Sequence, residues 1–156
     1  MVKSDWSQLN RLQLGRYAEY LVSMEFTRSG LGVFRSEVDD RGIDLAVRND
    51  HGDFFEIQVK SVFKSAYVFF QKDKFPISER LYAAVVRFRT GTDPMVWLIP
   101  SVVWETPAAP FSSRDFKAGK AKPEWGLSLA KKHWPVLDQF RFDRCLPRLS
   151  SKMGGA

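Results

Sequence analysis

Charged and amide side chains interrupt two apolar segments in the first half of the chain, where a buried strand would carry none. Asp44 lies within GIDLAV, and a carboxylate, an amide and an ammonium group alternate along FFEIQVKS at Glu56, Gln58 and Lys60. Strand periodicity places these three side chains on one face and the apolar residues between them on the other. If the neighbouring strand brings Asp44 to the same edge, the oxygens form a compact acidic pocket with one lysine.

Such a pocket would suit one kind of chemistry. Clustered carboxylate and amide oxygens are ligands for Mg²⁺ or Mn²⁺. A metal held there could bind a phosphate oxygen and lower the pKa of a bound water, while the lysine stabilises the charge that grows on phosphorus. This is the chemistry of phosphodiester hydrolysis. The alternative is a solvent-exposed strand face with a Glu56–Lys60 pair, and the alternation alone favours that alternative.

The elements that must position these residues follow from periodicity and turn signals. The spacing of apolar residues predicts one helix over 7–28 that turns Leu21, Val22 and Met24 or Glu25 inward with its earlier apolar positions. A short helix should follow Ser101 as its N-cap, and a last helix over 135–145 should bury Val136 and Phe140. The stretch 106–126, rich in Pro and Gly, is expected to be irregular. Strands are predicted at 32–38, 42–48, 53–62, 66–70, 81–89 and 95–100.

This order indicates an α/β (α+β) fold in which helices pack against one mixed sheet. We expect a single domain over residues 1–150 and a flexible tail over 151–156. Aromatic residues of the strands and of the short helix, including Phe69, are expected in the core. No segment has the roughly 18 uncharged apolar residues of a membrane span. The first residues lack the pattern of a secretory signal, so a cytoplasmic location is expected.

Charge is distributed unevenly along the chain. Lys and Arg number 24 against 18 Asp and Glu, which gives a net charge of +6, and the whole excess lies in residues 79–156. A cationic surface of this kind favours a polyanion such as nucleic acid, although a solvated, lysine-rich face that aids solubility is the plain alternative. One cysteine and two histidines exclude an intramolecular disulfide and a Cys/His zinc site. The expected nucleic-acid contacts are Lys117, Lys120, Lys122, Lys131 and Lys132.

The order of these motifs resembles the PD-(D/E)XK nuclease superfamily. Asp44, followed after a hairpin-sized gap by Gln58-Val-Lys60, is similar to its bipartite signature, and LGRYAEYLVSMEF with Glu19 looks like its leading helix. The likeness covers about residues 10–62. It is greatest to variants whose second half reads Q-x-K, among them a branch of group I intron homing endonucleases and small bacterial proteins with RGIDL and QVKS segments.

The resemblance implies a restriction-endonuclease-like core and a role for each motif residue. Asp44 would be the central metal ligand, Gln58 a ligand through its amide oxygen, Lys60 the catalytic lysine and Glu19 a further ligand. This sequence has Ile43 where the usual pattern has proline, a departure that many relatives tolerate, and a neutral Gln58 where most have Asp or Glu. Glu56, on the same strand face, is a hypothetical source of the missing charge.

The function implied is a Mg²⁺- or Mn²⁺-dependent endonuclease that cuts DNA. We expect a homodimer or homotetramer, because a domain of this size covers little duplex. One alternative is a nuclease-fold module that binds nucleic acid or a protein and has lost catalysis. The other alternative is a small basic protein that binds RNA or another protein.

Overall fold

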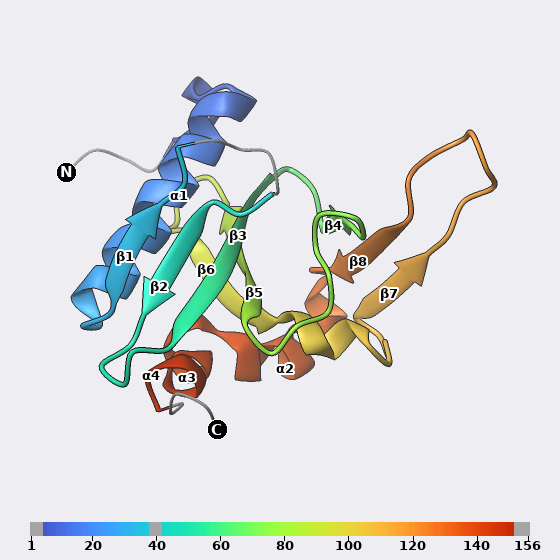
Figure 1. Ribbon diagram of the computed structural model, residues 1–156. Helices are drawn as coiled ribbons and strands as arrows, with labels where there is room; N and C mark the ends of the chain where they lie inside the picture. The colour runs from blue at the N-terminus through green and yellow to red at the C-terminus, as the bar shows by residue number, and fades with distance from the viewer. Residues whose placement is uncertain (1–4, 38–41, 152–156) are drawn as a thin grey trace.

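The computed structural model describes residues 5–37 and 42–151, and a five-stranded mixed sheet forms its centre (Figure 1). The strand order is β1-β2-β3-β5-β6, and β3 and β5 are parallel while the other neighbours are antiparallel. The mixed sheet expected from the sequence is therefore confirmed. The strands are β1 (Gly32–Arg35), β2 (Leu45–Arg48), β3 (Phe54–Phe63), β5 (Leu81–Phe88) and β6 (Met95–Pro100).

Helix α1 (Arg11–Arg28) covers one face of this sheet (Figure 1). It begins later than the predicted residue 7, because Asn10 and Gln13 form a capping box there and a 3-10 turn, η1 (Trp6–Gln8), precedes it. Its buried residues lie three or four positions apart, as one helix face requires. Met24 is 58% exposed, which corrects its predicted inward position. The buried face consists of Leu14, Ala18, Val22 and Phe26.

A second sheet, which the sequence did not predict, lies beside the first. It has the order β4-β8-β7, with β4 (Tyr67–Gln71), β7 (Phe111–Arg114) and β8 (Glu124–Ser128). Two strands therefore form within and just beyond the stretch expected to be irregular. Gly126 permits the pairing, because a Cβ there would collide with the hydroxyl groups of Tyr67 and Ser112. The segment between β7 and β8 projects away from the central sheet (Figure 1).

The C-terminal helix is broken into short turns, which corrects the continuous helix predicted over 135–145. Arg141 is extended, with φ −53° and ψ 142°, and forms a bridge to Trp97 of β6, so the helix cannot continue through it. Leu137 and Phe140 are buried, but Val136 is 43% exposed. The turns are η3 (Lys131–His133), α2 (Trp134–Leu137), η4 (Asp138–Phe140), α3 (Phe142–Cys145) and α4 (Pro147–Ser150).

The turn η2 (Ser101–Trp104) joins the two sheets. The Trp104 ring packs against the aromatic rings of both the small sheet and its flanking loop, and its indole N–H donates to the Gly126 carbonyl at 2.8 Å. Ser101 is not the predicted N-cap. Its hydroxyl instead accepts from the backbone N–H of Ser78 and donates to the Ser78 carbonyl. No helix among residues 5–37 and 42–151 is long and apolar enough to cross a membrane.

Candidate functional site

Asp44 lies where the ladder between β2 and β3 ends. Leu45 pairs with Ile57 in that antiparallel ladder; Asp44 directly precedes Leu45, and Gln58 directly follows Ile57. The backbone N–H of Asp44 donates to the Ile57 carbonyl at 3.0 Å. Its carboxylate Oδ2 accepts from the Val59 N–H at 2.7 Å. Through these two bonds Asp44 lies at the edge of β3 beside Ile57 and Val59, the two neighbours of Gln58.

Gln58 is the buried polar residue of this pair. Its side chain is 7% exposed, and its Oε1 atom has no hydrogen-bond partner within the described part of the chain. Gly42 packs beside it with φ 74°, and a Cβ there would lie 3.3 Å from Gln58 Nε2 and 3.2 Å from the Lys74 Cβ. Glycine therefore serves both the turn and the close approach at this position. Glu56, two residues earlier on the same face, is exposed.

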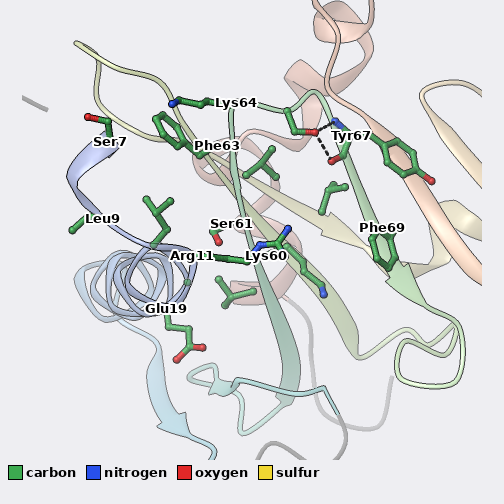
Figure 2. A pocket seen from close by; sticks show the side chains of 16 residues that line it. Ser7, Leu9, Arg11, Glu19, Lys60, Ser61, Phe63, Lys64, Tyr67 and Phe69 are labelled. Atoms are coloured by element: carbon green, nitrogen blue, oxygen red, sulfur yellow. Dashed lines mark hydrogen bonds between the residues drawn. The ribbon is translucent and has the colours of Figure 1, made fainter. Parts of the chain in front are cut away.

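Glu19 and Lys60 line one cleft of about 700 Å³ between α1, β3 and β4 (Figure 2). The Lys60 ammonium lies 5.8 Å from the ring centroid of Phe70 and 6.0 Å from that of Phe69. The Glu19 carboxylate is 3.6 Å from the Arg35 guanidinium. Asp44 and Gln58 are not among the lining residues, but Val59, whose N–H binds Asp44, is one of them. One pair, Glu19 and Lys60, therefore lines the cleft, and the other, Asp44 and Gln58, does not. Val59 links them, because it lines the cleft and its N–H bonds to Asp44.

The donor atoms fit a weakly held hard cation. Among residues 5–37 and 42–151, no three Asp, Glu, His or Cys side chains gather closely enough to hold a metal by themselves. Mg²⁺, however, keeps several waters and is often bound through one or two carboxylates and the substrate phosphates. Asp44 supplies a carboxylate and Gln58 an amide oxygen. A buried oxygen without a partner calls for a cation, a donor or a water, because its desolvation is otherwise uncompensated.

The five predicted nucleic-acid-binding lysines form two groups on different elements. Lys117, Lys120 and Lys122 belong to the projecting segment between β7 and β8, where Lys122 pairs with Asp73 at 3.2 Å. Lys131 and Lys132 are exposed in η3. Asp39 and Asp40, which precede the Asp44 strand in the sequence, lie outside the described residues.

Sequence reasoning missed the cations nearest the cleft. Arg11 and Lys64 line it with Lys60, and Arg87 and Arg89 line the adjoining cleft. One signal was available for Arg11, because it precedes Glu19 by eight residues on the same helix, and Gly15 at the intermediate position also lines the cleft. The other three cations come from turns and strand ends that carry no periodicity.

Comparisons with known proteins support the fold. No protein-family model matches the chain, and no curated protein matches it in sequence. Its structure is similar to that of the bacterial homing endonuclease I-Ssp6803I, with a TM-score of 0.54 over 88% of this chain and 90% of that one, at 18% sequence identity. At this identity the likeness establishes the architecture alone. The chain has a restriction-endonuclease-like fold, with a central mixed sheet flanked by helices.

Proposed function

We propose that this protein is a metal-dependent endonuclease that hydrolyses DNA phosphodiester bonds. The observation that supports the proposal most is the buried amide oxygen of Gln58, which has no hydrogen-bond partner among the described residues. Asp44 bonds to the two residues of β3 on either side of Gln58. The likeness in fold to a homing endonuclease adds support. A solvent-exposed strand face does not account for a glutamine that is buried with its acceptor oxygen unpaired within the described residues.

In this proposal each residue has a distinct task. Asp44 and Gln58 hold the divalent ion, and Glu19, across the cleft, is a further ligand. When bound, Mg²⁺ or Mn²⁺ would polarise the phosphate and lower the pKa of its water. The Lys60 ammonium lines the same cleft and would stabilise negative charge that develops on the phosphate oxygens. Glu56 is proposed to add negative charge at the edge of the site.

The basic residues would position the DNA backbone. Lys117, Lys120, Lys122, Lys131 and Lys132 are proposed to contact phosphates, which gives affinity that depends on salt and carries no sequence information. A homodimer or homotetramer would bring two such sites to the two strands of a duplex. Light scattering of the protein with and without DNA tests this, and an 18.0 kDa species alone would contradict it.

Cleavage of supercoiled and branched DNA with Mg²⁺ or Mn²⁺ tests the catalytic proposal. We expect Asp44→Asn and Lys60→Met each to lower the rate by about 100-fold or more, which is typical when one stabilising group is removed from a transition state. Asp44→Asn keeps an oxygen for the Val59 N–H, and Lys60→Met keeps an apolar stem over the two phenylalanine rings. Cleavage that persists in both variants would contradict the proposed roles.

Matched controls for these variants come from exposed positions elsewhere. Asp143→Asn in α3 removes the same charge as Asp44→Asn, and Arg28→Met in the last turn of α1 removes a cation from a side chain that is 81% exposed. Both controls should cut DNA at the wild-type rate.

A second candidate function is a nuclease-fold module that binds nucleic acid without cutting it. The neutral Gln58 and the lack of three gathered acidic, His or Cys side chains within the described ranges favour it. Titration calorimetry with Mg²⁺ and Mn²⁺ separates the two functions. Metal binding that is lost in Asp44→Asn supports the nuclease, whereas DNA binding with neither metal binding nor cleavage supports the module.

A further inference from the structure

Strand β3 extends well beyond its neighbour β2. The ladder between them ends at Ile57, while β3 continues to Phe63 and remains paired with β5 along that length. Across the part of the chain that the structure describes, no strand pairs with the other edge of residues 59–63. This uncovered half of β3 forms one side of the 700 Å³ cleft, with α1 and β4 as its walls (Figure 2).

Cations dominate this cleft and the one that adjoins it. Arg11, Lys60 and Lys64 line the first cleft against one carboxylate, Glu19. A second cleft of about 420 Å³ shares Phe63, Lys64 and Ser65 with the first and adds Arg87 and Arg89. The two clefts adjoin at these shared residues and are together called the groove below; their linings hold five cations and one acid. A groove with this charge is complementary to a polyanion.

The basic turn η3 lies close to the second cleft, through Trp134, which directly follows it. The Arg89 guanidinium lies 5.8 Å from the ring centroid of Trp134, and the Lys131 ammonium lies 5.9 Å from the same ring. Trp134 is half-buried, so part of its surface remains in contact with solvent. A chain of cations thus links Lys60, at the proposed catalytic site, to a basic turn that follows β8 in the sequence.

Aromatic side chains interleave with these cations. Phe69 is 45% exposed, against the buried position that the sequence predicted, and its ring lies 6.0 Å from the Lys60 ammonium. Phe63 and Tyr67 are half-buried in the cleft lining. Grooves that bind single-stranded nucleic acids combine a cationic track for the backbone with aromatic rings that stack on bases. A duplex keeps its base faces stacked inside, so it makes no use of such rings.

We propose that this groove binds a single-stranded segment of DNA and leads it to the catalytic site. The substrate class would then be DNA with an unpaired arm, such as a branched or splayed duplex. The binding part of this inference stands without catalysis, whereas the assignment of substrate class rests on the proposed nuclease function.

The backbone at Lys64 supports a binding role for this residue. Lys64 has φ 60°, the one positive value for a residue other than glycine among residues 5–37 and 42–151. This conformation is strained for a residue with a side chain, and glycine would avoid most of that strain. An exposed lysine held there is consistent with a task for its ammonium group. The variant Lys64→Gly therefore removes the charge at a position whose backbone conformation suits glycine.

Fluorescence anisotropy in EDTA tests the groove without cleavage. The probes are a labelled oligothymidylate of about 16 nucleotides and a duplex of the same length. We expect tighter binding of the single strand, and a log–log salt slope that falls by about 0.7 in Lys64→Gly and in Arg89→Met. Phe69→Ala should weaken single-strand binding about fivefold or more. Arg28→Met is the control and should leave both quantities unchanged.

Failure of the groove and failure of catalysis give different results. Duplex binding that equals or exceeds single-strand binding, with no effect of the groove variants, would overturn the groove even if the protein cuts duplex DNA with metal. Tighter binding of an oligouridylate of the same length would overturn DNA as its occupant. Single-strand binding that depends on Lys64 and Phe69, with no cleavage of any DNA, supports the groove and contradicts the nuclease. An unfolding temperature of Lys64→Gly at or above wild type shows that lost binding is not lost folding.

Discussion

Replacement of Gln58 by methionine should stabilise the protein. The glutamine side chain is 7% exposed and its Oε1 atom lacks a partner among the described residues. A buried, unpaired polar group costs about 1–3 kcal/mol, and methionine is an unbranched, apolar side chain of similar length. We expect Gln58→Met to raise the free energy of unfolding by about 1–2 kcal/mol. For a chain of 156 residues, that corresponds to about 2–8 °C in Tm.

Urea denaturation in EDTA measures this gain, and added Mg²⁺ or Mn²⁺ measures its cost to function. A ligand that binds only the folded state stabilises it by RT ln(1 + [L]/Kd), so metal should stabilise the wild type and not Gln58→Met. Gln58→Glu should behave in the opposite way. It buries a charge and so destabilises the metal-free protein, but it should gain the most stability from metal.

An exposed glutamine elsewhere in the chain, Gln139, provides the control for Gln58→Met. Gln139→Met changes the same atoms at an exposed site, where the amide donates to the Val136 carbonyl at 3.1 Å, and should alter stability by less than about 0.5 kcal/mol. If Gln58→Met is less stable than wild type, the amide oxygen has a partner in the folded protein. The argument for a metal ligand at Gln58 then fails.

Three further predictions concern the surroundings of the site. Glu19→Gln should lower metal-dependent cleavage. It should change the free energy of unfolding by less than about 0.5 kcal/mol, because the ion pair of Glu19 with Arg35 is solvent-exposed. Glu25→Gln is the control, and equal cleavage by the two variants would remove Glu19 from the site. Asn49→Ala should lower the free energy of unfolding, measured in urea, by about 2–3 kcal/mol. The buried Asn49 amide accepts from two turn N–H groups and donates to the Leu149 carbonyl at 2.7 Å. A smaller loss would show that water replaces these bonds. Burial raises the pKa of Tyr82 from 10.0 to about 12 in the folded state, so the stability that the neutral phenol contributes is complete below pH 10.0 and is lost as the pH rises toward 12. Tyr82→Phe should not show this loss of stability in thermal unfolding over the same pH range. Identical pH profiles for the variant and the wild type would contradict this prediction.

The first half of the chain was predictable because its signals are local. Helix α1 has its capping residues and buried face within one segment. The strands β2 and β3 are joined by a turn in which the Asn49 side chain accepts from the His51 and Asp53 N–H groups, so their register follows from the turn itself. The alternation along β3 then separates Gln58 and Lys60 from the core-facing residues. Local pattern was thus enough to predict that the strand before the turn carries Asp44 to the edge of β3, where it bonds to Ile57 and Val59.

The second half depends on contacts between distant residues, which no local pattern shows. β7 and β8 are short and polar, and they form because β8 pairs with β4, about 57 residues earlier in the chain. The last helix breaks because Arg141 pairs with Trp97. The exposure of Phe69, by contrast, follows from strand alternation, because Phe70 is fully buried and adjacent residues of a strand face opposite ways. The prediction that buried both had ignored that rule.

Asp44 couples the proposed catalytic site to the groove beside it. Its Oδ2 accepts the Val59 N–H at 2.7 Å, two residues beyond Ile57, which is the last residue of β3 paired with β2. The carboxylate thus takes the place of a backbone carbonyl and ends the ladder at that point, so the edge beyond it stays open. A slip of β3 by one residue would move Gln58 and Lys60 to the face that Phe55 and Ile57 now occupy. Phe55 and Ile57 are fully buried, so their burial fixes the register. The residue proposed to bind the metal is therefore also the residue that marks where the groove begins.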